Sequence, residues 1–396
     1  MKKTLVLCAS AALLCACQSE GFVIDGSIAH ADGARVTLVR EITQERIDST
    51  TIENGRFRLS GKVDTPERYL LEVNANPAGT PAEELDPEQI FITAFYLENS
   101  KISLTADTET MPTLYWQQDR VVKPTQVVGS MQEDLRRQLD ERRSEVNDRL
   151  SELAERMMNE YYLPMDAGKA DEAGKAGIEI ARQEQKVMDE RQQITLDFAR
   201  ENPGAAVSFD EISYLMSDIP ALTAAQIDEL MAILAPAWEG TPKFEQLKEQ
   251  AAKARKLAVG EPYIDCEFYN LDGELVPLSS VIPKGRYVML EFWASWCSPC
   301  RGEIPHLKHV RKAYPDFNII SISLDDKQEV WKKVLKEEGM DWPQLRDNGF
   351  QQGHAFNDYR VMGIPCCIIL DPEGRFCKVN MRGAYLDAFL EDLYGR

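Results

Sequence analysis

The first part of the chain after residue 21 consists of short stretches in which apolar and polar residues alternate. Residues 35–39 and 56–59 alternate in this way, and residues 69–73 and 91–97 are rich in β-branched and aromatic side chains. Turn signals such as Asp32-Gly33 and Asn54-Gly55 separate the stretches. Several short strands at this spacing predict an antiparallel β-sandwich domain over residues 22–128.

A three-to-four-residue periodicity replaces the alternation over residues 129–256. Apolar residues between 131 and 161 recur on one face of a helix, and a second stripe spans residues 187–198. Pro164 and Gly168 are predicted to end the first helix, and Asn202-Pro203-Gly204 the second. Shorter helices are expected over 205–217, 223–235 and 242–257. We find no catalytic constellation and no internal repeat in residues 22–256.

Residues 257–396 contain both the two-residue alternation typical of strands and the three-to-four-residue periodicity typical of helices. Strands are predicted over 287–293, 318–324, 366–370 and 376–379, and helices over 300–314, 329–338 and 385–393. Residues 371–374 form the turn between the last two strands. This order, β-α-β-α-β-β-α, predicts an α/β domain. The expected fold class is therefore multidomain: an antiparallel β-sandwich, a helical middle segment and a C-terminal α/β domain.

The start of the chain has the pattern of an export signal. Two lysines precede an apolar stretch over residues 5–16, which is too short to span a bilayer. The stretch ends in Leu14-Cys15-Ala16-Cys17, which resembles a bacterial lipobox. We expect a signal peptide over residues 1–16, acylation of Cys17 and a linker over 17–21. Acyl chains on Cys17 would anchor the protein stably to a membrane. The alternative is an ordinary cleaved signal peptide.

Two features of this region bear on location. Gln18 follows the acylated cysteine where an Asp often signals inner-membrane retention, so the periplasmic side of the outer membrane is favoured over the inner membrane. No other apolar run reaches the ~18 residues of a spanning helix. The expected location is the cell envelope, not the cytoplasm.

Composition excludes one class of partner. The formal net charge is −20, and a phosphate backbone would repel such a surface, so no nucleic acid is expected.

The nine cysteines are informative by position: none lies between residues 18 and 265. A disulfide-stapled exported protein would spread its cysteines through every domain. Their clustering indicates thiol chemistry in the C-terminal domain.

The chemistry is concentrated in Trp296-Cys297-Ser298-Pro299-Cys300, which follows a predicted buried strand and opens a helix. This stretch resembles the thioredoxin fold, and specifically the TlpA/ResA-like thiol–disulfide oxidoreductases, over about residues 257–396. The β-rich part resembles the small β domain that precedes thioredoxin domains in many lipoproteins of Gram-negative anaerobes. A zinc site would need a second ligand pair, and none of suitable spacing is present, so neither a metal nor a cofactor is expected.

The position of the two cysteines predicts their roles. Cys297 is expected to cap the helix, where the partial positive charge of the N-terminus stabilises a thiolate. It would attack a substrate disulfide, and Cys300, one turn further and less exposed, would resolve the mixed disulfide. The resemblance implies the same roles, with a redox disulfide between Cys297 and Cys300.

Glu291 stands six residues before Cys297 in an apolar strand. In thioredoxins a buried carboxylate at this spacing helps to deprotonate the resolving cysteine. Burial would raise its pKa toward neutrality, which suits proton transfer. The alternative is a glutamate on an edge strand that points to water.

The resemblance implies further site residues. Gly363-Ile364-Pro365 resembles the family's cis-proline loop, which would place Ile364, Pro365 and Trp296 against substrate. Glu303 matches a glutamate near the active site of ResA-like proteins, and its alternative is a simple charge in the first helical turn. Cys366 and Cys367 depart from the family pattern. They are expected to face opposite ways, with one toward the active site, and Cys366 is a possible substitute resolving thiol. Cys266 and Cys377 look solitary.

The expected activity is thiol–disulfide exchange on protein disulfides, as a reductase or isomerase. The expected partners are these substrates, an upstream donor that is a membrane or periplasmic thiol protein, and the membrane itself. Two alternatives stay open. One is a peroxidase of the AhpC/TSA type, although Ala294 occupies the threonine position of that motif. The other is a surface binding lipoprotein with an inert redox domain.

Overall fold

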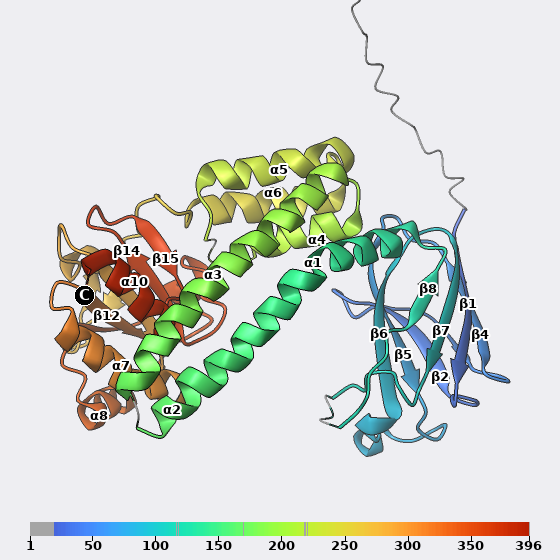
Figure 1. Cartoon of the computed structure of the whole chain (residues 1–396), viewed down its shortest axis with the longest axis horizontal. Helices are drawn as coiled ribbons and strands as arrows, with labels where there is room; N and C mark the ends of the chain where they lie inside the picture. Colours follow the sequence, from blue (N-terminus) through green and yellow to red (C-terminus); the bar gives the residue numbers. More distant parts are fainter. Residues whose placement is uncertain are drawn as a thin grey trace, which may run out of the picture. The chain divides into compact units, whose positions relative to one another are not determined.

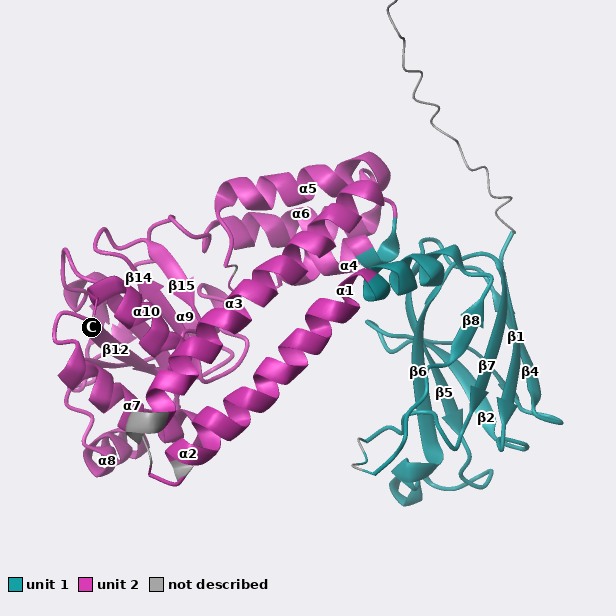
Figure 2. Ribbon diagram, in the orientation of Figure 1, with its two compact units in different colours: residues 1–141, 205–207 teal, residues 142–204, 208–396 magenta. Residues whose placement is uncertain are grey.

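The computed structural model describes residues 20–115, 117, 119–168, 170–217, 219 and 221–395. The predicted signal peptide (1–16) and the acylation site Cys17 lie outside these residues. The chain divides into two compact units, residues 1–141 with 205–207 and residues 142–204 with 208–396 (Figure 2). The expected boundary between a helical segment and a C-terminal domain at residue 257 is therefore not a boundary between compact units. Among the described residues, no helix is long and apolar enough to cross a membrane.

The first unit contains two four-stranded sheets. In the order β4-β1-β7-β8, one sheet is built from β4 (Arg56–Gly61), β1 (Phe22–Ala29), β7 (Lys101–Asp107) and β8 (Gln126–Val128). In the order β3-β2-β5-β6, the other is built from β3 (Arg46–Thr51), β2 (Arg35–Arg40), β5 (Glu67–Asn74) and β6 (Ile90–Leu97). Two 3-10 turns, η1 (Ala82–Glu84) and η2 (Pro87–Gln89), precede β6.

The two sheets contribute to one hydrophobic core, and alternate residues are buried in β1, β4, β5 and β7. Phe22, Ile24 and Ile28 of β1 belong to the same cluster as Tyr69 and Leu71 of β5. One pairing differs from the antiparallel prediction, since β1 and β7 run parallel with Ile24 opposite Ile102. The prediction was wrong at this point because pairing between strands so distant in the chain is not encoded in local alternation.

The helical segment begins with α1 (Met131–Arg156), which contributes residues to both units. A π-helical turn, η3 (Met157–Tyr162), and α2 (Leu163–Asp166) continue it, so the helix runs past Pro164, the first predicted stop, and ends just before Gly168, the second. Pro164 lies in the first turn of α2, where a backbone N–H is not needed. The remaining helices are α3 (Ala170–Glu201), α4 (Ala206–Leu215), α5 (Ala224–Trp238) and α6 (Pro242–Arg255).

The C-terminal domain has a seven-stranded sheet in the order β10-β9-β13-β12-β11-β14-β15. Figure 1 labels β12, β14 and β15 of this sheet. The strands are β9 (Glu267–Tyr269), β10 (Leu275–Pro277), β11 (Val288–Trp293), β12 (Asn318–Ser323), β13 (Gln344–Arg346), β14 (Cys366–Leu370) and β15 (Phe376–Val379). Its helices are η4 (Leu278–Ser280), α7 (Ser298–Ala313), α8 (Gln328–Glu338), α9 (His354–Asn357) and α10 (Ala384–Tyr394). The predicted β-α-β-α-β-β-α order is confirmed, and β9, β10, β13 and α9 are additional.

The sheet separates two hydrophobic clusters, because successive residues of β11 point to opposite faces. Met289 and Trp293 belong to one cluster with Cys297 and Cys300. Leu290 and Phe292 belong to the other, which also contains Cys266 and Cys366. Glu291 lies between Met289 and Trp293 in this alternation, so its side chain is on the face of the two redox cysteines.

The helical segment packs directly on the C-terminal domain, within the second compact unit. Ala384 and Ala388 of α10 share a buried cluster with Ile180 of α3 and Tyr161. The Tyr385 hydroxyl donates a hydrogen bond of 2.6 Å to Glu184. Residues 142–204 are thus part of the same folded body as the redox domain.

Candidate active site

The two cysteines of the Trp-Cys-Ser-Pro-Cys motif are joined by a disulfide at the start of α7, with Cα atoms 5.3 Å apart. Cys297 is the N-cap residue, and its Sγ accepts a hydrogen bond of 3.2 Å from the Cys300 backbone N–H. The helix N-terminus therefore favours negative charge on this sulfur. Cys297 is 5% exposed and Cys300 1% exposed, while neighbouring Trp296 is 64% exposed. Cys297 is the more accessible of the pair, in the expected order.

The turn that carries Cys297 is anchored by a buried carboxylate that the sequence analysis did not identify. Asp325 is 3% exposed and accepts hydrogen bonds from the Ser295 backbone N–H (2.9 Å) and hydroxyl (2.6 Å). The Ser323 hydroxyl donates a third bond of 2.7 Å. Asp325 follows β12, which runs parallel to β11, so the carboxyl ends of both strands meet at this edge. The position of Asp325, two residues after the end of β12, was the sequence signal that could have identified it as a site residue.

Glu291 is buried in the centre of the sheet at 5% exposure. Its strand pairs with β12 on one side and β14 on the other, so the alternative of an edge-strand glutamate in water was wrong. Burial raises the pKa of Glu291 to about 8, against a hydrogen bond from Ser321 and with the help of the Glu303 charge. The other carboxyl oxygen, Oε2, has no hydrogen-bond partner in the part of the chain that the structure describes. A protonated, half-satisfied carboxyl group thus lies on the disulfide's side of the sheet.

Glu303 belongs to a partly buried row of three hydrogen-bonded side chains. Its Oε1 is 2.8 Å from Nδ1 of His306, and Nε2 of His306 is 2.9 Å from Oδ1 of Asp387. The Gly383 backbone N–H also donates to Glu303 (3.0 Å). Burial alone would lower the pKa of His306, but the hydrogen bonds and charges of Asp387 and Glu303 outweigh it and raise the pKa to about 10. His306 is therefore an imidazolium that ties α7 to α10.

The contact with His306 also affects the charge of Glu303. Burial raises the pKa of Glu303, but the hydrogen bond and positive charge of His306 outweigh burial and lower it below its ordinary value. The sequence analysis assigned no role to His306. The signal for the contact with Glu303 was the spacing of three residues on one helix.

The loop before β14 lies at the boundary of the two core clusters. The Ile364–Pro365 peptide bond is cis, and Ile364 packs against both clusters. Cys366 and Cys367 face opposite sides of the sheet, as expected. Cys367 shares the cluster of Cys297 and Cys300, and Cys366 lies in the other. Cys367, rather than Cys366, is thus the free thiol on the side of the redox pair.

Cys367 is poorly suited to react in the folded protein. Burial holds the pKa of its thiol well above the ordinary value, and its Sγ donates a hydrogen bond of 3.1 Å to the Met381 carbonyl. Cys377 is half-buried and free. Cys266 is not solitary, because it lies beside His354 and Asp358.

Comparison with known proteins identifies both parts of the chain. Residues 285–376 match the family model described as thioredoxin-like, and residues 22–135 match DUF4369, a domain of unknown function. The thiol–disulfide oxidoreductase ResA of Bacillus cereus is 26% identical over 155 residues, which cover 39% of this chain and 86% of that protein. ResA of Bacillus subtilis is 26% identical over 125 residues, which cover 31% of this chain and 66% of that protein.

Solved structures of similar proteins match about a third of the chain. The thioredoxin domain of a thiol–disulfide oxidoreductase from Bacteroides vulgatus is 32% identical, with 35% of this chain and 98% of that chain covered and a TM-score of 0.32. A thiol–disulfide oxidoreductase from Bacteroides fragilis is 29% identical, with 34% and 99% covered and a TM-score of 0.32.

The matched region contains the helix-capping disulfide of Cys297 and Cys300, the buried Glu291 and the loop of Pro365. The family match and the similarity to ResA therefore agree with the chemistry of the site. Through its C-terminal domain, the chain is a thioredoxin-like thiol–disulfide oxidoreductase that is similar to the ResA proteins.

Proposed function

We propose that the protein is a membrane-anchored thiol–disulfide oxidoreductase that acts on protein disulfides in the cell envelope, with Cys297 as nucleophile and Cys300 as resolving thiol. The lipobox-like Leu14-Cys15-Ala16-Cys17 supports the anchor and the location. The greater exposure of Cys297 and its place at the helix N-terminus support the assignment of roles.

The proposed reaction has two steps. In the first, the Cys297 thiolate attacks a substrate disulfide, forms a mixed disulfide and releases one substrate thiolate. In the second, Glu291 first releases its own proton to solvent, its carboxylate then takes the proton of Cys300, and the Cys300 thiolate attacks the Cys297 sulfur. The second substrate thiolate leaves, and the Cys297–Cys300 disulfide remains. A thiol protein of the envelope must then reduce this disulfide before another cycle.

The observation that carries this proposal is the buried carboxyl of Glu291 on the disulfide's face of the sheet. Its pKa of about 8 is close to the ~8.5 of an unperturbed thiol, so a proton moves between the two groups at little cost. Once Glu291 is ionised, its Oε2, which has no hydrogen-bond partner among the described residues, is available to accept that proton. A reductase or isomerase needs this transfer in order to release its substrate.

The test is to trap the mixed disulfide. Cys300→Ala removes the resolving thiol, so the protein expressed in its native envelope should hold clients in complexes that dithiothreitol releases. Cys297→Ala should trap nothing. Mass spectrometry of the complexes would identify the clients. Wild type should also reduce a model disulfide such as insulin.

The free thiols need a control. Because Cys367 lies on the side of the redox pair, Cys300→Ala, Cys367→Ser excludes it as a substitute resolving thiol, and a matched Cys300→Ala, Cys366→Ser variant tests the other cysteine. If none of these variants forms a mixed disulfide and wild type leaves insulin intact, the proposed action on protein disulfides is wrong. An inert redox domain on a binding lipoprotein would then be the better account.

A peroxide-consumption assay tests the second enzyme class. Ala294 is buried and supplies no hydroxyl where the peroxidase motif has threonine. We therefore expect no peroxide turnover above that of the Cys297→Ala variant.

A further inference from the structure

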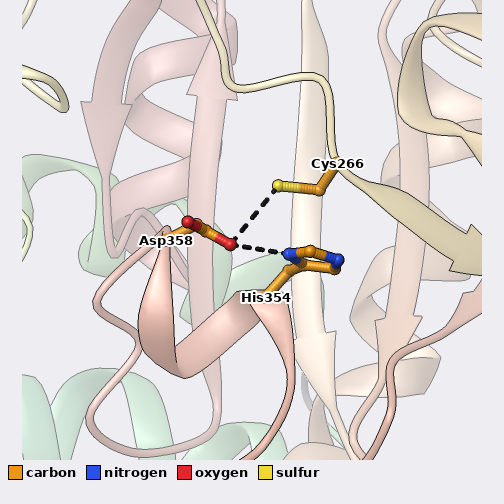
Figure 3. A group of neighbouring side chains, drawn as sticks. All are labelled: Cys266, His354 and Asp358. Carbon is orange, nitrogen blue, oxygen red and sulfur yellow. Dashed lines mark hydrogen bonds and ion pairs between the residues drawn. The ribbon is translucent and has the colours of Figure 1, made fainter.

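Three potential metal ligands meet on the other side of the domain's sheet from the redox pair. Cys266, just before β9, is 7% exposed and lies in the cluster that excludes Cys297 and Cys300. Its side chain points toward His354, the first residue of α9, and toward Asp358, as Figure 3 shows. One ligand atom from each residue lies within 4.8 Å of the other two. Residues separated by 92 positions in the sequence thus meet in one place.

The geometry of the three groups excludes a nucleophilic triad. In such a triad the imidazole lies between the nucleophile and the carboxylate and takes the nucleophile's proton. Here the carboxylate occupies the middle: the Cys266 Sγ donates to Oδ2 of Asp358 (3.8 Å), and the same oxygen is 2.6 Å from Nδ1 of His354. Sγ, Nδ1 and Oδ2 therefore lie close enough together to bind one metal ion, which would take the place of the hydrogens between them.

The backbone around the cluster is fixed by other contacts. Asp347 is 1% exposed and accepts hydrogen bonds from the backbone N–H groups of His354 (3.1 Å) and Ala355 (2.7 Å), which hold the start of α9. The buried Tyr359, next to Asp358, donates its hydroxyl to the carbonyl of Ile264, two residues before Cys266. The two segments that supply the ligands are thus joined without any metal.

The ligand set fits Zn²⁺. Thiolate, imidazole and carboxylate bind zinc at ~2.3, ~2.0 and ~2.1 Å, which places tetrahedral ligand atoms about 3.4 to 3.6 Å apart. The Sγ–Oδ2 distance of 3.8 Å is already close to this. The Nδ1–Oδ2 distance of 2.6 Å must lengthen, and the Asp358 side chain is 43% exposed and free to make that shift.

We propose that Cys266, His354 and Asp358 form a Zn²⁺ site that is separate from the thiol–disulfide centre and independent of its activity. On binding, the Cys266 thiol releases its proton to solvent and a zinc–sulfur bond forms. Three protein ligands leave the fourth tetrahedral position for water. The prediction of no metal rested on sequence spacing, which cannot detect ligands from separate segments.

The test uses Co²⁺ as a spectroscopic substitute for Zn²⁺ in the full chain. The protein is first oxidised, so that Cys297 and Cys300 form their disulfide and supply no thiolate. We expect one equivalent of Co²⁺ to give tetrahedral d–d bands and a thiolate-to-metal charge-transfer band, and Zn²⁺ to abolish both. A surface group of His30, Asp107 and Glu109 also resembles a metal site, but without sulfur it gives no charge-transfer band.

Matched variants locate the site. Cys266→Ser should remove the charge-transfer band, and Cys377→Ser, at a half-buried cysteine outside the cluster, should leave it unchanged. His354→Ala changes a side chain that is 43% exposed, so the fold should persist while Co²⁺ affinity falls by more than about tenfold. Absence of the band from the oxidised wild-type protein would overturn the proposal. A band that survives in Cys266→Ser with unchanged affinity, or full affinity in folded His354→Ala, would overturn it equally.

Discussion

At the scale of single residues, the site depends on carboxyl groups whose protonation is set by burial. Glu291 holds its proton because the core replaces water around it, and this outweighs a hydrogen bond from Ser321. Ser321 itself accepts a hydrogen bond of 2.8 Å from Nε1 of Trp342, so its hydroxyl proton is directed toward Glu291. Glu303, by contrast, stays ionised because His306 compensates its charge. Two glutamates near one another therefore differ in charge at neutral pH.

Glu291→Gln should slow the resolution of mixed disulfides between pH 6 and 8, because the amide cannot accept the Cys300 proton. Stopped-flow measurement of thiol release from a preformed mixed disulfide checks this. Trp293→Phe, a change of another buried residue on the same strand and face, controls for altered packing. Equal rates and equal pH profiles in Glu291→Gln and wild type would reduce Glu291 to a structural residue.

Stability gives a second measurement on Glu291. Its folded-state pKa of about 8 lies above the ordinary 4.5, so the folded protein binds this proton more tightly than the unfolded chain. The free energy of unfolding is therefore highest below about 4.5 and falls as pH rises toward 8. Glu291→Gln removes this dependence. Urea unfolding at pH 5 and pH 8 should show the variant gaining on wild type by a few kcal/mol across that interval.

His306 gives a pH dependence in a higher range. Its folded-state pKa of about 10 exceeds the ordinary 6.5, so the stability it contributes is fully present below 6.5 and is lost as pH rises through 10. His306→Gln should lower the free energy of unfolding by about 3 kcal/mol at pH 6, because Glu303 and Asp387 lose a buried cation. The difference from wild type should shrink toward pH 10. The exposed His309→Gln should change neither value, and an equal effect of the two variants would contradict the assignment.

At the scale of elements, the position of α10 depends on how closely α3 approaches it. Gly177 of α3 faces Tyr161 and Ala384, and a Cβ at Gly177 would lie 2.4 Å from the Tyr161 ring and 2.9 Å from the Ala384 Cβ. Asp387, which binds His306, lies on the same α10 helix. The close packing of α3 against α10 thus helps to position Asp387 for its contact with His306.

Two glycines one helical turn apart make a matched test of this packing. Gly177→Ala should destabilise the protein by about 1–3 kcal/mol, since the methyl group overpacks the contact. Gly174→Ala meets no atom within 4 Å and should stabilise α3 by about 0.5–1 kcal/mol. Thermal unfolding of the two variants checks the opposite signs. A stabilised Gly177→Ala protein would mean that α3 and α10 are not in close contact.

At the scale of the whole molecule, the redox domain is one part of a longer chain with an expected anchor. Cys17→Ser should lose the acyl mass and leave the membrane fraction, because the acyl chains on Cys17 are the proposed anchor. Mass spectrometry and membrane fractionation check this, with Cys15→Ser as the control that should remain acylated. Unchanged retention of Cys17→Ser in membranes would remove the lipoprotein assignment.

The sequence by itself determined what depends on neighbours in the chain. The period of apolar residues predicted the strands and helices of the C-terminal domain, and Cys297 at a helix start predicted a reactive thiol, because helix caps and dipoles are local. The apolar strand around Glu291 predicted its burial for the same reason. The continuation of the helix through Pro164 was missed, because a proline in a helical pattern usually ends the helix. Here a π-helical turn precedes Pro164, which lies in the first turn of α2.

Only the tertiary structure decided which distant groups meet. The parallel pairing of β1 and β7, the Asp325 contacts to Ser295 and the His306–Asp387 pair all join segments that no local pattern connects. The cluster of Cys266, His354 and Asp358 has the same origin. Such contacts arise when the burial of apolar surface brings distant segments together. Each buried polar group then forms hydrogen bonds with groups of the segment that packs against it. Its partners are therefore a property of the folded chain and not of any single stretch of sequence.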